Sequence, residues 1–399
     1  MKSKRIAIIG GGFTGMYCSL LLLDRFPTSA DAIYLFEAQD YLGGRNKMGL
    51  FENIPVSNGA GVIRERDVLL KELCRRFNIP MHPFVSKINY AFETKGKSVE
   101  KYIQELKKHK KEWNRQETFS TNFKRIVGVK EYQHFISLCG YTDFQHADIL
   151  DTVNHYGFQD VTPNQKMYSV SWDDLMNAMK KYMISTGRFH LSLQHPIDDI
   201  TGIYNYFDDV IWTGPRPTWD ILTSFFDNLE IEKWNEAINQ VGCQPFLRAY
   251  AVPSSKQEQE TAKKLFPTTT FFSYKNPLQK LMVITKKTKT IYMISYSDNE
   301  NAIITDNQMK QKGLQQWLYQ WTGIKWNMTT LKKYPTCCGT HYFKPLHLQK
   351  KWKSRQSFLR FIQNPKKNLY LCSEGLSFNQ GWTEGALESA LNVVQVISL

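Results

Sequence analysis

The chain has 399 residues, enough to bury a large core and to form two or three domains. Apolar residues make up 42% and charged residues 22%, proportions that are ordinary for a globular protein and exclude a fibrous or disordered chain. Apolar runs stay well short of the ~18 residues that a membrane span needs, so we expect no membrane span.

The chain has a formal net charge of +14, and basic residues crowd into one segment at residues 95–116. We expect a helix there whose lysines face solvent, with Tyr102, Ile103, Leu106 and Trp113 turned inward. A basic helix can also bind phosphates or anionic lipid, but no nucleic-acid motif accompanies these lysines. Nucleic acid is therefore not a predicted partner.

The seven cysteines are scattered, with neither a CxxC pair nor the spacing of a zinc site. This pattern is typical of a reducing compartment, so we expect a cytoplasmic protein without structural disulfides or a bound metal.

The first elements read as a βαβ unit. "IAII" at residues 6–9 is an apolar, β-branched run typical of a strand buried on both faces. "FTGMYCSLLLLDRF" follows as a helix that ends near Pro27, and "AIYLFEAQ" from Ala32 is a second strand. A secretory signal is the alternative, but glycines interrupt its apolar core and no small-residue cleavage site follows.

Glycines occupy the turn of this unit in the spacing Gly10-x-Gly12-x-x-Gly15. The first allows a tight turn, the second lets the backbone approach a pyrophosphate, and the third lets helix and sheet pack closely. Glu37 ends the second strand, where its carboxylate can accept hydrogen bonds from an adenosine ribose. The stretch therefore predicts a dinucleotide site.

Later elements are predicted from periodicity. We expect residues 63–160 to be mostly helical and residues 243–296 to be rich in strands. The clearest single elements are the helices "RERDVLLKELCRRFNI", "SWDDLMNAMKKYMIST" and "NQMKQKGLQQWLYQWTG", the strands "RFHLSLQHPIDDI", "DDVIWTG" and "NLYLCSE", and a final helix from about Thr383.

A second glycine pair, Gly43-Gly44, is followed at once by Arg45. Two glycines and a guanidinium suit a second approach to the same pyrophosphate, with Arg45 offering a bidentate fork. An ordinary surface turn is the other interpretation of these three residues.

With Arg45 in place, the chain resembles the flavin-containing amine oxidase family, which includes monoamine, polyamine and L-amino-acid oxidases. Four further segments match in order: "SNGAGVIRERDVLLKELCRRFNI", "LQHPIDDI", "DDVIWTGPRP" and "NLYLCSEGLSFNQGWTEGALESALNVV". The resemblance implies FAD as cofactor. It places Gly61 and Val62 beside the isoalloxazine, Ile197 at the adenine, Glu374 on the ribityl hydroxyls, and Thr383 where a helix N-terminus points at the flavin ring.

The resemblance also implies the architecture, a mixed α/β (α+β) fold in which a Rossmann-like FAD-binding domain is interleaved with a substrate domain. The expected FAD-binding domain comprises residues 1–62, 165–215 and 335–399. A helical insertion spans 63–164, and a substrate-binding domain with a β-sheet spans 216–334.

In the resembled oxidases two aromatic side chains flank the amine in front of the flavin. Trp382 matches one of them, while the other position falls on Gly339, where His341 or Tyr342 is a possible substitute. Cys338 falls where monoamine oxidases carry the cysteine bonded to the flavin. Other members lack that bond, so we expect non-covalent FAD, with a link through Cys338, or neighbouring Cys337, as the alternative.

Many family members also carry a lysine that holds a water near flavin N5 and assists reaction with oxygen. Lys280 and Arg248 are the candidates here, and an ordinary strand-edge cation is the alternative for each. A substrate bearing a carboxylate would need an arginine, for which Arg216 and Arg248 are available.

The resulting functional expectation is an FAD-dependent oxidase that takes a hydride from the α-carbon of a neutral primary or secondary amine. The imine then hydrolyses, and oxygen is reduced to peroxide. One alternative is another flavoenzyme on the same fold, such as a UDP-galactopyranose-mutase-like isomerase or a desaturase. Another is a flavin-bearing structural or binding protein with little turnover. The expected partner is a small amine, and the sequence predicts no oligomeric state.

Overall fold

A computed structural model describes residues 3–25, 32–227, 230–267, 270–286, 288–345 and 352–397. Pro27, near which the first helix is predicted to end, lies outside the described residues.

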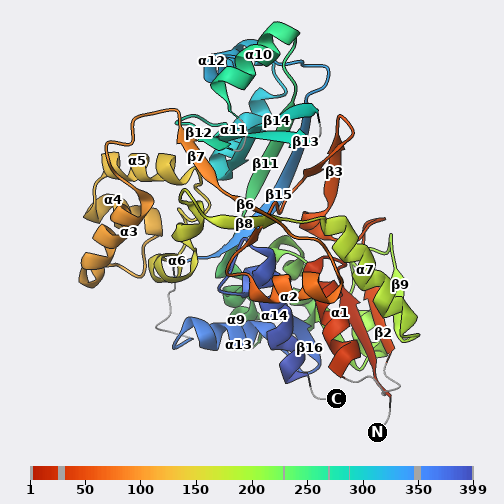
Figure 1. Cartoon of the computed structure of the whole chain (residues 1–399). Helices are drawn as coiled ribbons and strands as arrows, with labels where there is room; N and C mark the ends of the chain where they lie inside the picture. Colours follow the sequence, from red (N-terminus) through yellow and green to blue (C-terminus); the bar gives the residue numbers. More distant parts are fainter. Residues whose placement is uncertain are drawn as a thin grey trace.

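A five-stranded parallel sheet forms the lower part of the molecule in Figure 1, in the order β16-β10-β1-β2-β9. Its strands are β1 (Arg5–Ile9), β2 (Ala32–Phe36), β9 (Phe189–Ser192), β10 (Asp209–Trp212) and β16 (Leu369–Leu371). All four pairings are parallel, and β1 lies between β10 and β2. The strand–helix–strand unit predicted at the start of the chain is confirmed, with α1 (Phe13–Arg25) as its helix.

Alternate residues of these strands enter two separate cores. Ile6 and Ile8 of β1 face one core, whereas Ala7 and Ile9 face the other, as the period of two in a strand requires. The first core is covered by α1, α2 (Val68–Arg76), α7 (Trp172–Ser185) and α14 (Thr383–Val396). The second is covered by α8 (Thr201–Tyr206), the 3₁₀ helix η4 (Arg216–Phe225), α9 (Glu230–Asn239) and α13 (Arg355–Gln363).

A second sheet of six strands lies above the first in Figure 1, in the order β15-β11-β14-β13-β12-β7. Its strands are β7 (Lys87–Tyr90), β11 (Val241–Ala251), β12 (Thr270–Ser273), β13 (Lys280–Lys286), β14 (Lys289–Asp298) and β15 (Lys332–Phe343). Only the β12–β7 pair is parallel. Residues of α10 (Lys256–Leu265), α11 (Asn299–Gln308) and α12 (Leu314–Thr322) pack on this sheet or at its end.

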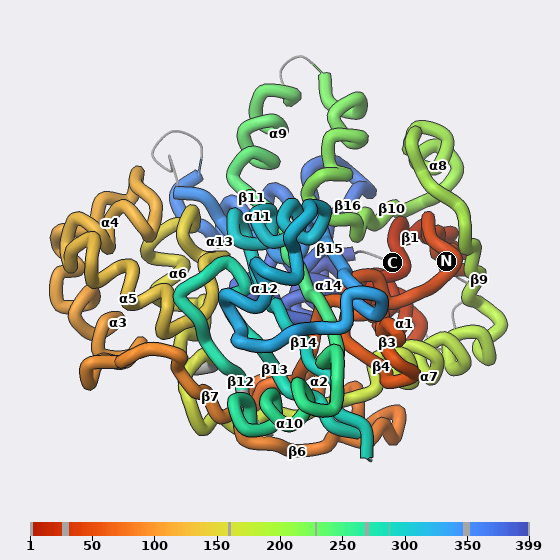
Figure 2. The backbone as a smooth tube through the Cα atoms, turned by 90° about the horizontal axis from the view of Figure 1, so that it is seen from above, coloured from red at the N-terminus to blue at the C-terminus, as the bar shows by residue number. Residues whose placement is uncertain are grey.

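A helical segment lies to the left of both sheets in Figure 1 and far from α1 in Figure 2. It contains α3 (Val99–Lys108), α4 (Phe119–Ile126), α5 (Val129–Cys139) and α6 (Ile149–His155), with the short 3₁₀ helices η2 (Lys110–Glu112) and η3 (Phe158–Val161). Tyr102, Ile103 and Leu106 are buried in its aromatic core, while Lys107 and Lys108 are exposed. The solvated basic face predicted for residues 95–116 is confirmed.

Short elements complete the fold: β3 (Met48–Phe51), β4 (Ile54–Ser57), β5 (Ile63–Arg64), β6 (His82–Val85) and β8 (Lys166–Ser169), with η1 (Gly44–Asn46) and η5 (Glu374–Leu376). Three strands, β5, β6 and β7, fall within the stretch predicted to be mostly helical. The strand predicted over 188–200 ends at Ser192, and the helix predicted over 307–323 begins only at Leu314, after Gly313 adopts a φ of +88°. The predicted α/β class is confirmed, and the division into domains stays a prediction.

Gly15 provides a test of the packing between α1 and the sheet. A Cβ at Gly15 would lie 2.0 Å from the carbonyl oxygen of Gly10, whereas a Cβ at Gly12 would meet nothing within 4 Å. We expect Gly15→Ala to lower the free energy of unfolding by about 2 kcal/mol or more, since a clash with backbone outweighs the better helix propensity of alanine.

Gly12→Ala is the matched control, with an expected change within about 0.5 kcal/mol. Urea unfolding followed by circular dichroism measures both variants. Equal stability of the two would show that helix and sheet do not need this close approach.

Candidate functional site

The first glycine turn leads from β1 into the N-terminus of α1. Gly10 has a φ of +112°, a conformation that favours glycine, and its N–H donates to the carbonyl oxygen of Phe36 at 2.8 Å. The Glu37 carboxylate accepts from the Gly11 N–H at 2.6 Å. The space above Gly12 is open, so the free N–H groups of the helix start can be approached by an anion.

The second glycine pair lies directly against the first. Gly43 donates from its N–H to the carbonyl oxygen of Gly11 at 2.9 Å and forms a parallel bridge with Gly12. Gly44 has a φ of +51°, and a Cβ there would lie 3.4 Å from the Cα of Gly12. The two glycine stretches found in the sequence therefore form one surface of backbone.

Arg45 links this surface to the C-terminal part of the chain. Its Nη1 donates to the Glu374 carboxylate at 2.9 Å and to the carbonyl oxygen of Gly339 at 3.0 Å. Glu374 follows β16 at the carboxyl edge of the parallel sheet, the edge at which α/β folds bind ligands.

Glu374 is only 4% exposed and is held by several donors. The Nδ1 of His341 lies 2.6 Å from its carboxylate, and the backbone N–H groups of His341 and Gly381 also donate to it. Burial alone would raise the pKa of Glu374, but His341, Arg45 and Gly381 together hold that pKa well below its usual range. The residue therefore presents a fixed negative charge beside Arg45.

The start of α14 is fixed to the N-terminal segment. Asn46 donates from Nδ2 to Oγ1 of Thr383 at 2.8 Å, and Trp382 stacks against the Arg64 guanidinium at 3.9 Å. Arg64 in turn donates to Asp67 at 2.8 Å. Thr383 and Trp382 thus come close to the residues that follow the second glycine pair.

The segment that contains Gly61 and Val62 runs between two arginines. The N–H of Ala60 donates to the carbonyl oxygen of Arg45 at 3.2 Å, and Arg248 donates from Nε to that of Gly59 at 2.9 Å. Gly61 is exposed and Val62 is half-buried.

Arg248 itself lies against the ring of Tyr296 at 3.8 Å. Its Nη1 is buried without a hydrogen-bond partner among the described residues. Such a donor can serve an acceptor of a bound molecule.

Ile197 is half-buried and packs against the second core. The neighbouring His195 donates from its N–H to the carbonyl oxygen of Glu37 at 2.8 Å. The loop of Ile197 therefore lies near Glu37, on the side of the first turn where an adenosine is expected.

Lys280 lies in a buried aromatic environment on β13. It is 4% exposed, and its Nζ lies 3.2 Å from the centre of the Tyr141 ring and 5.8 Å from that of Tyr296, the ring that Arg248 also contacts. Burial lowers the pKa of Lys280 to about 7, although nearby Cys139, Asp298 and Asp143 oppose that change. Burial and the neighbouring Asp298 raise the pKa of Asp143 to about 8.

Several of these residues were not indicated by the sequence as binding residues. The resemblance predicts His341 only as a possible substitute aromatic, yet its ring contacts the Glu374 carboxylate. Asn46, Tyr141 and Tyr296 belong to no motif, and only their positions in the fold reveal them. Cys338 is 4% exposed, with its Sγ 3.3 Å from Nε2 of His341.

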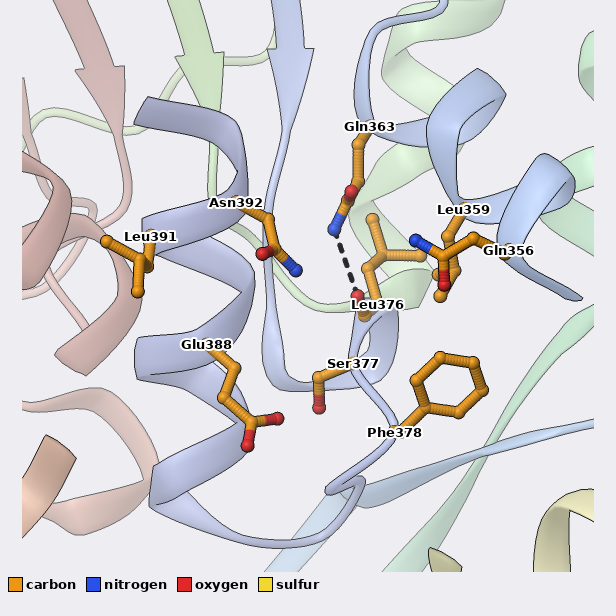
Figure 3. Close-up of a pocket in the computed structure, with 9 residues that line it drawn as sticks. All are labelled: Gln356, Leu359, Gln363, Leu376, Ser377, Phe378, Glu388, Leu391 and Asn392. Atoms are coloured by element: carbon orange, nitrogen blue, oxygen red, sulfur yellow. Dashed lines mark hydrogen bonds between the residues drawn. The ribbon is translucent and has the colours of Figure 1, made fainter. Parts of the chain in front are cut away.

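Two pockets lie beyond these contacts. One, drawn in Figure 3, lies between α13 and α14, where Gln363 donates to the carbonyl oxygen of Leu376 at 3.0 Å. None of the predicted cofactor residues lines it. The other is bordered by Asp143, His341 and Tyr342, and it reaches the Glu374 cluster from the side of the helical segment.

Among the described residues, no helix is both long and apolar enough to cross a membrane. No group of three or more His, Cys, Asp and Glu side chains in the same part of the chain is arranged to hold a metal ion.

Comparison with solved structures identifies the fold. Putrescine oxidase bound to putrescine aligns with a TM-score of 0.67 at 10% identity, covering 99% of this chain and 98% of that chain. Cyclohexylamine oxidase from Brevibacterium oxydans gives 0.69 at 13% identity and 99% coverage of both chains. The chain has the fold of these oxidases. A protoporphyrinogen oxidase-like protein from Exiguobacterium gives 0.70 at 13% identity, covering 99% of this chain and 98% of that one.

The sequence itself matches no protein-family model and no curated protein. At the level of fold, the resemblance to flavin-containing amine oxidases is confirmed. At 10–13% identity the comparison shows the fold alone, so the roles of the individual site residues stay predictions.

The lowered pKa of Lys280 predicts that the stability of the protein depends on pH. Its pKa of about 7 in the fold lies below the ~10.4 of an unfolded lysine, so between these values the unfolded chain binds more protons. The stability of the wild type relative to Lys280→Met should therefore be lowest at and below pH ~7 and rise towards pH ~10, by a few kcal/mol.

Urea unfolding of both proteins across this pH range measures the difference. Lys286→Met, at an exposed position on the same strand, is the control and should show no such trend. A difference between wild type and Lys280→Met that stays constant with pH would mean that Lys280 keeps its proton in the fold.

Proposed function

We propose that this protein is an FAD-dependent oxidoreductase of the amine oxidase type. The observation that carries the proposal is the meeting of two glycine stretches with the Arg45–Glu374 pair at the carboxyl edge of the parallel sheet. The fold neighbours that act on putrescine and cyclohexylamine support it.

The residues present fit an extended dinucleotide. Gly12 offers open space at the N-terminus of α1, and Gly44 and Arg45 provide a second approach for a diphosphate. Glu37 and the loop of Ile197 suit the adenosine end. At the other end, Glu374 suits the ribityl hydroxyls, and Gly61, Val62 and the start of α14 at Thr383 suit the ring.

FAD, when bound, supplies the two-electron acceptor for a hydride from the substrate. The role of the protein is to position and desolvate the amine. Trp382 is proposed as one wall of the amine path, and the Arg64 guanidinium against its ring fixes its orientation.

Lys280 and Arg248 are proposed to assist reoxidation by oxygen with release of peroxide. Lys280 suits this role because burial allows it to be neutral or charged near neutral pH. Cys338 is engaged with His341, so we propose non-covalent FAD.

A desaturase is the second candidate, because the protoporphyrinogen oxidase-like neighbour matches the fold as well as the amine oxidases do. The substrate in either case is proposed to be a small molecule and the location the cytoplasm.

Gly12→Ala tests the cofactor site without disturbing the fold. The added methyl would occupy the open space that the diphosphate needs, so FAD binding should weaken by more than about tenfold, or 1.4 kcal/mol. Gly202→Ala on α8, where a Cβ also meets nothing within 4 Å, is the control and should bind FAD as the wild type does. Flavin fluorescence quenching measures both, and equal affinities would contradict the proposed site.

The reaction is tested with a panel of primary and secondary amines under anaerobic conditions, followed by oxygen. We expect loss of flavin absorbance with at least one amine, and peroxide on re-aeration. Because the reacting amine must be neutral, kcat/KM should rise with pH. Loss of flavin absorbance with a donor that gives up hydrogen from carbon–carbon bonds, and with no amine, would favour the desaturase. No loss with either class of donor would rule out both candidates.

A further inference from the structure

A small pocket lies between the helical segment and the end of β15. Residues between 143 and 156 form one wall, on the side of the helical segment where α6 faces the two sheets in Figure 1. Tyr342 and Phe378 border the other side, and the N–H of Asp148 donates to the carbonyl oxygen of Phe343 at 2.8 Å where the two sides meet. The volume of about 40 Å³ is roughly three times what one buried water needs, so the pocket can hold a small organic ion.

This pocket is separate from the residues proposed to face the flavin ring. Neither Trp382, the proposed wall of the amine path, nor Thr383 at the start of α14 borders it. The pocket approaches the cofactor residues at His341, whose Nδ1 lies 2.6 Å from the Glu374 carboxylate. A molecule bound in the pocket would therefore lie outside the proposed amine path.

The pocket contains one carboxylate that is not engaged in an ion pair. Asp143 is half-buried, and one of its carboxylate oxygens accepts from the Tyr156 hydroxyl at 2.5 Å. Among the described residues Asp143 forms no ion pair, whereas Asp151 on the same wall is paired with Arg355 at 2.7 Å. The described residues that border the pocket include no lysine or arginine. The lining therefore favours a cation and disfavours an anion.

A buried hydroxyl on the same wall lacks a hydrogen-bond partner. Thr152 on α6 is 4% exposed and borders the pocket, and its Oγ1 has no partner among the described residues. A buried polar group without a partner costs free energy, so a ligand that donates a hydrogen bond to it is favoured there. An ammonium group carries three such donors.

Aromatic rings form much of the remaining lining. Phe144 and Tyr156 pack with ring centres 4.9 Å apart, and the ring of Phe378 lies 4.4 Å from that of His155. Burial lowers the pKa of His155, so this ring carries no charge near neutral pH. A carboxylate, an unpaired hydroxyl and aromatic faces together suit an organic ammonium ion.

We propose that this pocket is a binding site for a small organic ammonium ion, a second amine site apart from the path at Trp382. Asp143 supplies the negative charge, Thr152 supplies a hydrogen-bond acceptor, and the aromatic rings contact the carbon atoms of the ligand. The inference goes beyond the proposed function, because it requires neither bound flavin nor turnover.

The protonation of Asp143 makes this binding depend on pH. Burial and Asp298 at the end of β14 raise the pKa of Asp143 to about 8, while Tyr156 and Lys280 on β13 oppose that rise. Between pH ~7 and pH ~9 the ionised fraction of Asp143 grows from about a tenth to about nine-tenths, so the affinity for an ammonium ion should rise about tenfold. Lys280, with a pKa of about 7, loses its positive charge over the same range, which acts in the same direction.

Calorimetric titration of the full chain with methylammonium chloride, at pH ~9 and constant ionic strength, tests the site. We expect saturable binding in the wild type, binding at least about tenfold weaker in Asp143→Asn, and binding about fivefold weaker in Thr152→Val. Two controls should bind as the wild type does: Glu260→Gln, which removes an exposed carboxylate on α10, and Trp382→Phe. Circular dichroism of each variant verifies its fold.

The wild type alone gives a second measurement, which does not depend on the folding of a variant. Its affinity for methylammonium should rise about tenfold from pH ~7 to pH ~9, and sodium acetate, an anion of similar size, should not bind. The proposal is overturned by the absence of saturable binding, by an affinity that is the same at both pH values, or by equal affinity in Asp143→Asn. Binding that Trp382→Phe weakens as much as Asp143→Asn does would place the ammonium in the amine path and also overturn it. Protein that binds methylammonium but no FAD refutes the proposed function and leaves this site standing.

Discussion

Glu374 carries a carboxylate at a depth where water is nearly absent, and a charge in such a place is stable only beside partners. Those partners come from widely separated parts of the chain: Arg45 from the N-terminal segment, His341 from β15 and Gly381 from the turn before α14. Removing one would leave the others with an uncompensated charge. This one group therefore determines how the first βαβ unit, the second sheet and the final helix meet, and the proposed cofactor surface exists only where they do.

The parts of the fold that the sequence predicts are those with a strong local signal. The first strand, its glycine turn and α1 have a pattern that the alternative of a secretory signal fits poorly, and the helix from Thr383 begins where predicted. The short strands β5 and β6 have no alternating pattern, and the four alternating residues of β7 are too short a signal until β12 pairs with them. The helical pattern predicts Gly313 inside a helix, although its positive φ makes it the boundary of one.

The candidate site also contains some residues that the sequence predicts and others that only the fold reveals. Gly12, Gly44 and Arg45 could be found from the sequence because each belongs to a motif with its own physical reason. The contact between Lys280 and Tyr141, and that between His341 and Glu374, join residues far apart in sequence and depend on how the sheets and the helical segment pack. No spacing rule reports such pairs. The glycine motifs and Arg45 predict a cofactor site, whereas the packing of the fold decides which other side chains lie near it.

The order of strands in the parallel sheet has a consequence for biosynthesis. β1 is flanked by β2, made soon afterwards, and by β10, whose residues leave the ribosome some two hundred positions later, while β16 pairs with β10 last of all. Contacts between residues so far apart in sequence make folding slow. Until β10 has been synthesised, one apolar edge of β1 has no neighbouring strand. The nascent chain is therefore vulnerable to aggregation during translation, and a chaperone has a long interval in which to act.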